Sequence, residues 1–522
     1  MLPDYDRNHQ HMLLIRQFRM WRECHSSEIR LFVVVLFALG IAAFYLSLHL
    51  MVPQKEDPDE GVYLMAARLL NAGHPCSSFS FDQFWMFPRL LAASFQIFHD
   101  SLGVGRVVVV VFSVTGLIGM AVLAGQLGAP WAAPLAIICG VIDPCYLAQS
   151  RIALSDVPGV ACMIWAVVTI TLFRRRDQRG WLALGGAITA SALVIKPLTV
   201  IFAAVLVAWL ILHRIQRSDA GLQLKLRELA LDFMVFGGAA ILIAAPFVDF
   251  GDLAGEFRRT VFAHWTESQQ DAPGVIQRLR GLLNYIARVF MWLPFAVVGI
   301  WGGMRSDRQL TTGLAAGELL SAALLVQFPP WPNHYTLLSP VLIVFAAAGM
   351  HHALMLLKHS FDRAGQSRGG IGSTAGPKFI TVLSRLGISV WLLSLPWLVH
   401  NNLQVLDEPT NDLTSLTTYL KANGASGRYL LTDNAIIVYR ADGLIPPIAM
   451  NLPFPRTFSS YANGRNELQK VMSRYPVSAI VLTSDYAQDP RLIFWIRQQF
   501  PNSALVRGNS LETTAHVFSR AK

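Results

Sequence analysis

Long apolar stretches separated by short charged segments dominate the first four hundred residues of the chain. About 20 consecutive apolar residues suffice to cross a membrane as a helix. We predict eleven such crossings, near residues 31–52, 104–125, 131–148, 157–173, 181–195, 198–213, 229–249, 286–303, 311–327, 335–357 and 379–399. The fold class expected is therefore mainly α, a polytopic transmembrane helical bundle over residues 31–400 that follows a short segment, 1–30.

The pattern changes after residue 400. Residues 401–522 have an ordinary density of charge and frequent turn residues, and short β-like runs at Tyr429–Thr432 and Ala479–Thr483 alternate with helical stretches at Asn466–Arg474 and Arg491–Phe500. Such alternation is typical of a small α/β layer. We predict a separate extramembrane domain here. We expect the Gly/Ser-rich stretch 365–376, between the last two crossings, to be a flexible cytoplasmic linker.

Composition agrees with a membrane protein. Of the 522 residues, 53% are hydrophobic and only 15% are charged, whereas soluble domains carry about 25% charged residues. The five cysteines form no CxxC pair, so neither a disulfide framework nor a zinc site is expected.

The distribution of positive charge orients the chain. With a cytoplasmic N-terminus, nineteen Lys and Arg fall in the inner segments and nine in the outer loops, which satisfies the positive-inside rule. This bias explains most of the formal charge of +10, so no nucleic-acid partner is expected. The C-terminal domain is then extracytoplasmic, and we expect a multi-pass protein of a bacterial inner membrane.

Successive loops must alternate between the two sides of the membrane, and this alternation decides one ambiguous segment, Phe84–Phe98. Counting it as a crossing would place Arg174–Arg176 outside the membrane. We therefore expect a helix that lies in the outer interface, with Trp85 and the nearby Phe residues at headgroup level.

The first outer loop carries an acidic motif at Asp57–Glu60. Asp57 as N-cap, Pro58 at the first helical position and acids in the first turn are all typical of a helix start, which explains them without catalysis. The apolar stripe that runs from Val62 to Leu70 places Asp59 on the packed face or a cleft, while Glu60 projects to the other side. A carboxylate on a packed face is costly unless it is paired or functional.

A second polar group follows the third crossing: Asp143, then Gln149–Ser150–Arg151, then Ser155–Asp156. Ser155 or Asp156 can cap the next helix, which is the structural alternative for this motif. Capping does not explain Asp143 and Arg151 at membrane depth, where ionisable residues generally mark functional sites. A purely structural Asp143–Arg151 pair is the other possibility.

In this order and sidedness, the two motifs resemble those of the GT-C membrane glycosyltransferases. The resemblance is to the branch of protein O-mannosyltransferases and lipid A aminoarabinose transferases, and it covers about residues 31–350. Asp59–Glu60 matches the acidic pair of the first loop, and Gln149–Arg151 with Asp156 matches the second motif. His334–Tyr335 resembles the Arg/His-Tyr that opens a late crossing, whereas Phe87–Leu90 departs from the Pro-Pro-Leu stretch of many relatives.

The resemblance implies transfer of one sugar, with inversion, from a polyprenyl-phosphate donor to a hydroxyl of a glycan, lipid or protein acceptor at the outer face. This chemistry needs a base for the acceptor proton and cations for the departing phosphate. We expect Asp59 to be the base, with Glu60 and Asp156 as orienting groups. The expected phosphate ligands are Arg151, Lys196, Arg89 and His334, and a divalent metal would be held by Glu60, Asp156 and His334.

Simpler roles exist for two of these cations. Lys196 can be a lysine that extends to the interface, and His334 an ordinary interfacial residue at a helix start. Two other functions also fit a polytopic chain. A transporter or lipid flippase would place charges near the midplane and often shows repeated halves. A non-catalytic assembly subunit would use residues 401–522 as a docking module.

Overall fold

The computed structural model describes most of the chain. The described residues are 28, 31–47, 57–79, 84–217, 221–248, 275–327, 332–366, 413–450, 461–483, 490–508 and 514–520, with short pieces between 252 and 260 and between 382 and 400. The predicted segment 1–30, the linker 365–376 and the start of the C-terminal domain therefore lie largely outside the described residues. Of the predicted crossing 379–399, residues 382, 384–394, 396 and 397 are described, and they are helical.

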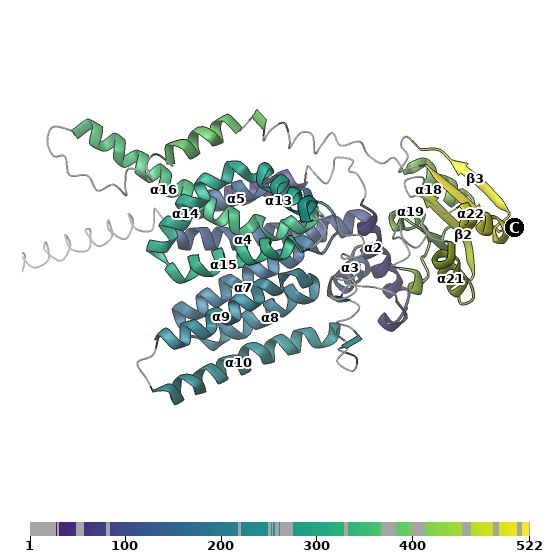
Figure 1. The fold of residues 1–522 in the computed structure, drawn as a ribbon, viewed down its shortest axis with the longest axis horizontal. Helices are drawn as coiled ribbons and strands as arrows, with labels where there is room; N and C mark the ends of the chain where they lie inside the picture. Colours follow the sequence, from purple (N-terminus) through teal and green to yellow (C-terminus); the bar gives the residue numbers. More distant parts are fainter. Residues whose placement is uncertain are drawn as a thin grey trace, which may run out of the picture.

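Most of the described residues belong to a bundle of helices (Figure 1). An apolar helix, Leu31–Ser47, comes first. It is followed by α4 (Leu102–Leu127), α5 (Ala132–Ile142), α6 (Pro144–Gln149), α7 (Asp156–Arg176), α8 (Arg179–Ile195), α9 (Val200–Arg217), α10 (Leu222–Ala244), α13 (Val275–Val289), α14 (Leu293–Ser306), α15 (Arg308–Leu325) and α16 (Ser339–Gln366). Short 3₁₀ turns join several of them: η2 (Pro197–Thr199), η3 (Ala245–Phe247), η6 (Phe290–Trp292) and η7 (Pro332–Leu337).

Six helical stretches in the described part of the chain are long and apolar enough to cross a membrane, so the protein is an integral membrane protein. They are Leu102–Leu127, Asp156–Arg176, Pro197–Gln216, Leu222–Phe247, Ile276–Ser306 and Ser339–Lys358. Three shorter apolar helices, Leu31–Ser47, Ala132–Ile142 and Arg179–Ile195, coincide with further predicted crossings. The total of eleven crossings stays a prediction.

Local sequence sets the ends of these helices. Ser101 caps α4, because its hydroxyl accepts a hydrogen bond from the Val104 amide at 3.2 Å. At the other end of the bundle, α7 finishes with Arg174–Arg176, whose positive charge complements the carboxyl end of the helix dipole, and stops at Asp177 in the left-handed region (φ 52°).

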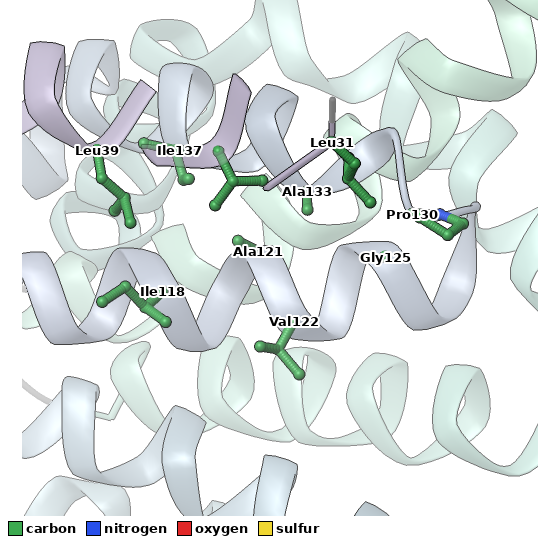
Figure 2. A pocket seen from close by; sticks show the side chains of 10 residues that line it. Leu31, Leu39, Ile118, Ala121, Val122, Gly125, Pro130, Ala133 and Ile137 are labelled. Carbon is green, nitrogen blue, oxygen red and sulfur yellow. The ribbon is translucent and has the colours of Figure 1, made fainter. Parts of the chain in front are cut away.

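Close helix contacts hold the bundle together. A Cβ atom at Gly299 of α14 would collide with the carbonyl oxygen of Phe345 in α16, so only glycine permits this approach. An apolar pocket of about 350 Å³ lies between helix Leu31–Ser47, α4 and α5 (Figure 2). Its lining includes Leu39, Ile118 and Ile137 and contains no titratable side chain, so it offers no catalytic group.

The C-terminal residues form a four-stranded mixed sheet in the order β1-β2-β4-β3. Its strands are β1 (Tyr429–Thr432), β2 (Val477–Thr483), β3 (Asn502–Val506) and β4 (Ala515–Ser519), and its helices are α18 (Thr414–Ala422), α19 (Ala435–Arg440), α21 (Tyr461–Met472) and α22 (Pro490–Gln499), with the turn η8 (Pro447–Ala449). Strand β1 is parallel to β2, and β4 is antiparallel to both β2 and β3. The two predicted strands and the two predicted helices are confirmed to within a few residues, whereas the independence of this domain stays a prediction.

Two short helices, α2 (Pro58–Asn71) and α3 (Met86–Ile97), lie between the bundle and the sheet (Figure 1). Helix α3 has only 12 residues, about 18 Å, so it is too short to span a membrane core of roughly 30 Å. On the sheet side, a Cβ atom at Gly61 of α2 would collide with the backbone of Ile436 in α19. Helix α19 therefore packs directly on the helix that carries the first acidic motif.

Candidate active site

Helix α2 begins as the sequence predicts. Asp57 is the N-cap and accepts a hydrogen bond from the Asp59 amide at 2.9 Å, and Pro58 occupies the first helical position. The helix ends at Asn71, after which Gly73 takes a positive φ of 87° that a residue with a Cβ rarely adopts. This helix start fixes the positions of Asp59 and Glu60.

The two acids point in the opposite sense to the one predicted. Glu60 is completely buried, and both of its oxygens bind the guanidinium of Arg106 in α4, at 2.8 and 2.7 Å. Asp59 is exposed. The prediction failed because α2 is buried on nearly all sides, against α3, α4 and α19, so its apolar stripe does not mark a single packed face.

Glu60 also fastens the second motif to the first. Its Oε1 accepts a hydrogen bond from the Ala153 amide at 2.8 Å, in the turn between α6 and α7. One helical turn after Asp59, the Tyr63 hydroxyl shares a hydrogen bond of 2.9 Å with the Ser155 hydroxyl. The Ser155 side chain thus contacts α2 and makes no capping bond to α7.

Asp156 is buried at the first position of α7, and its carboxylate forms an ion pair of 2.7 Å with the ammonium of Lys196. Lys196 directly follows α8, and the adjoining Gly159 of α7 leaves room for it, since a Cβ there would collide with the Cβ of Lys196. A lysine that merely extends to the interface would have no such carboxylate partner. The structure therefore places this cation beside the acidic motifs.

Electrostatics shows how close the two motifs are. Burial raises the pKa of Asp57 above its ordinary value, and the negative charges of Glu60 and Asp156 raise this pKa further. Hydrogen bonds from the Asp59 and Glu60 amides act in the opposite direction. Three acids from the two motifs therefore share one electrostatic environment at the end of the bundle that faces the sheet.

Two further predicted residues lie in segments next to this site. Arg151 is buried in the turn between α6 and α7, and its charge acts on the hydroxyl of Tyr45 in helix Leu31–Ser47. His334 is half-buried in η7, which packs against α6 and α7. The neighbouring Tyr335 stacks on Tyr285 of α13, with ring centroids 5.3 Å apart.

Asp143, by contrast, has a structural explanation. It is fully buried, caps α6 by accepting a hydrogen bond of 2.8 Å from the Tyr146 amide, and accepts another of 3.2 Å from the Trp292 indole nitrogen. These bonds satisfy a carboxylate that would be costly to bury alone.

Arg89 and Trp85 lie elsewhere. The Arg89 guanidinium donates to the Pro246 carbonyl at 3.0 Å and lies over the Phe247 ring, at the end of α10. Trp85 is buried against Phe79, so the prediction of an exposed headgroup-level Trp is wrong, and it is Phe98 that is largely exposed. Helix α3 is amphipathic, but its aromatic side packs on protein, since Phe87 meets Tyr63 of α2 and Trp85 meets Phe79, which follows η1 (Cys76–Ser78).

The residues expected to bind a metal do not fit one. Both Glu60 oxygens are engaged by Arg106 and Ala153, and Asp156 faces the Lys196 ammonium. Among the residues that the structure describes, no three His, Cys, Asp or Glu side chains form a metal-binding group. A buried carboxylate already paired with a cation is a poor ligand for a second one.

Arg106 is the residue that sequence reasoning missed. It is 7% exposed and lies one turn inside α4, in a run predicted to be a membrane crossing. The sequence did contain an indication of its role, because an arginine within an apolar crossing is expected to have a carboxylate partner. Its partner is Glu60.

One segment of the chain matches a known protein family. Residues 82–236 match a family described as dolichyl-phosphate-mannose-protein mannosyltransferase, a segment that holds Arg151, Asp156 and Lys196. Among curated proteins, the search finds no match.

Solved structures resemble most of the chain. ArnT from Cupriavidus metallidurans bound to undecaprenyl phosphate is 13% identical, with a TM-score of 0.62 over 93% of this chain and 98% of that one. An oligosaccharyltransferase from Archaeoglobus fulgidus is also 13% identical, with a TM-score of 0.55 over 86% of this chain and 69% of that one. The resemblance expected from the two motifs is confirmed, and this chain has the fold of the GT-C membrane glycosyltransferases.

Proposed function

We propose that the protein is a glycosyltransferase that moves one sugar from a polyprenyl-phosphate donor to an acceptor hydroxyl. The observation that carries the proposal is the joining of the two acidic motifs through Glu60, Arg106 and Ala153, next to the exposed Asp59. A lipid phosphate is the natural donor group, since the Cupriavidus protein binds undecaprenyl phosphate and the Archaeoglobus one dolichol-phosphate. Reaction on the extracytoplasmic side follows from the predicted orientation.

Asp59 is the general base in this proposal. Its exposure lets an acceptor hydroxyl reach it, while the Glu60–Arg106 pair beneath fixes the first turn of α2. The acceptor oxygen attacks the anomeric carbon opposite the phosphate, its proton passes to Asp59, and the sugar–phosphate bond breaks with inversion. Glu60 then serves as an orienting group, since its own oxygens are occupied.

The departing phosphate needs positive charge more than it needs a proton, because it is stable as an anion. Lys196 and Arg151 are the proposed ligands, with His334 as a third. Lys196 has a carboxylate partner in Asp156, which holds the ammonium in place before the phosphate arrives. Arg89 has the weakest support, because its guanidinium contacts Pro246, Phe247 and Cys76.

A transporter or flippase is the competing function. Transporters usually bind substrate near the bilayer midplane on interrupted helices. The motifs here gather instead at the start of α2, the start of α7 and the end of α8, all at the end of the bundle that faces the sheet. A one-sided arrangement suits an enzyme that meets its acceptor outside the membrane core.

The test is transfer by Asp59→Asn in proteoliposomes supplied with a labelled polyprenyl-phosphate sugar. We expect a loss of about 10²- to 10⁴-fold in rate, the usual contribution of a general base. Glu467→Gln, which neutralises an exposed carboxylate in α21, is the matched control and should transfer normally. Normal transfer by a well-folded Asp59→Asn variant would remove Asp59 as base, and loss of substrate flux without any transfer product would favour a transporter.

The sugar and the acceptor have to be found by chemistry. Mass spectrometry of envelope glycans, glycolipids and glycoproteins after deletion of the gene should show one missing sugar. If the envelope sugars were the same in the deletion strain and in the complemented strain, the non-catalytic assembly role would be favoured.

A further inference from the structure

Helix α13 has three distinct faces. At 100° per residue, Arg278, Tyr285 and Val289 fall on one side, and all three are buried. Arg278 donates to the Gln327 carbonyl at 2.8 Å, and Tyr285 stacks on Tyr335. This side fixes α13 to the ends of α15 and η7.

The second face is apolar and open. Ile276, Leu279, Leu283 and Ile286 follow one another at helical spacing, and Ile276 and Leu283 are 83% and 62% exposed. Four large apolar side chains on one open stripe are unusual on a surface in contact with water. Acyl chains are the natural environment for this face.

The third face adjoins the apolar one and is cationic. It carries Gln277, Arg280, Asn284 and Arg288, all exposed, and the helix contains no acidic residue. Arg288 is close enough to Cys145 of α6 for its charge to act on that thiol. A helix with apolar and cationic faces side by side is the pattern of a helix that lies in the membrane interface over anionic lipid.

Length also separates α13 from the crossing that follows it. Ile276–Ser306 forms a continuous apolar candidate of 31 residues, about 46 Å as a helix, against a hydrocarbon core of roughly 30 Å. The turn η6 interrupts it, and Phe290–Ser306 spans about 27 Å on its own. Residues 290–306 therefore suffice for the crossing, and α13 is free to lie along the surface.

We propose that α13 is a membrane-docking helix: Ile276, Leu279, Leu283 and Ile286 enter the acyl chains, and Arg280 and Arg288 bind phosphates of anionic membrane lipids. The helix then lies flat, from residue 276 toward α6 and the second motif. The proposal is independent of the catalytic roles given above, because it concerns depth and lipid charge alone.

Depth can be measured residue by residue. Single cysteines at positions 279, 280, 283 and 284, introduced in the full chain with its native cysteines replaced, carry a spin label in liposomes that contain phosphatidylglycerol. We expect oxygen access to exceed access of a polar nickel reagent several-fold at 279 and 283, with the reverse at 280 and 284. Position 242, exposed on the apolar helix α10, is the control for a label in the acyl chains.

A spanning α13 would show depth that changes steadily along the helix, and a protein partner would immobilise labels 279 and 283 and shield them from both reagents. Either result would overturn the proposal.

Lipid charge is tested with the double substitution Arg280→Glu and Arg288→Glu. The label at 283 should move deeper when phosphatidylglycerol replaces part of a phosphatidylcholine bilayer, and the double variant should lose this shift. Arg497→Glu with Arg507→Glu is a control of equal charge, since Arg497 in α22 and Arg507 after β3 are both exposed, and it should keep the shift. If the label at 283 moved deeper only when one polyprenyl phosphate per protein was added, and not with phosphatidylglycerol, the proposal that α13 docks on bulk anionic lipid would be overturned.

Discussion

The two ends of the helix bundle use charge differently. Away from the sheet, Asp232 accepts from both Arg179 and Arg214, Asp307 pairs with Arg174, and Arg174 and Arg214 lie over aromatic rings. At the end that faces the sheet, the buried Glu60–Arg106 pair underlies the exposed Asp59, and Asp156 pairs with Lys196.

The difference separates anchoring from chemistry. Arginines that pair with acids and also cover aromatic rings are expected to fix helix ends and gain from packing. The buried Glu60–Arg106 pair instead holds the first turn of α2, which carries the exposed Asp59. We therefore expect substitutions at the far end to affect stability alone, and substitutions at the sheet end to affect stability and transfer together.

The largest effect on stability is expected for Arg106→Met. It leaves the Glu60 carboxylate buried without its counter-charge, which should cost about 3–5 kcal/mol in the free energy of unfolding. Thermal and denaturant unfolding in detergent measures this cost, and Arg106→Lys, which keeps the charge but loses the two-pronged contact, should lose less. If the free energy of unfolding of Arg106→Met were within about 1 kcal/mol of the wild-type value, the Glu60–Arg106 pair would not be what stabilises this end of the bundle.

The far end should respond to Asp232→Asn with a smaller loss. Two arginines lose their charged acceptor, and hydrogen bonds to charged groups are worth about 1.5–3 kcal/mol. Transfer per folded molecule should be unchanged, measured against protein quantified by its folded fraction. If transfer fell along with stability, the two ends would not differ in the way described.

Gly61→Ala tests the contact between α2 and the sheet. The added methyl collides with the backbone of Ile436, and overpacking of this kind costs about 1–3 kcal/mol. Gly237→Ala in α10, where a Cβ meets nothing within 4 Å, is the matched control. Limited proteolysis should release the sheet residues faster in Gly61→Ala, and equal rates would mean that α2 and α19 separate without cost.

The smallest effect concerns Asp57. The pKa of Asp57 is raised in the folded protein, so the unfolded state loses this proton at a lower pH than the folded state does. The stability of the fold therefore decreases as the pH rises from the ordinary pKa, near 4, through the raised pKa of the folded protein. Asn caps a helix as well as Asp does, so Asp57→Asn should be slightly more stable than wild type at pH 7, by less than about 1 kcal/mol. The gain should vanish near pH 3, and a gain independent of pH would show that charge is not its cause.

Local rules predicted much of the fold. The bounds of α2 follow from Asp57, Pro58 and Gly73, and β1 coincides with its predicted range because its run of β-formers is bounded by turn residues. Strands β3 and β4 were not predicted, because their alternation of polar and apolar residues is weak, with exposed residues at Asn502 and Ser503.

The site was predicted less well than the fold. Both motifs were identified, but helical periodicity assigned Asp59 and Glu60 to the wrong sides. Periodicity describes one helix, whereas the orientation of Glu60 is set by Arg106 and Ala153, 46 and 93 residues away. Lys196 gained its carboxylate partner in the same way, through the meeting of α7 and α8.

The contact between Gly61 and Ile436 has a consequence for biosynthesis. A ribosome that adds 5–20 residues per second needs roughly 20–75 s to travel from the first of these residues to the second. During that interval the helix with the acidic pair is already outside the ribosome but lacks the backbone that covers it. A nascent chain can therefore insert its early crossings, yet it cannot complete the surroundings of Asp59 until α19 has been translated and packed on α2.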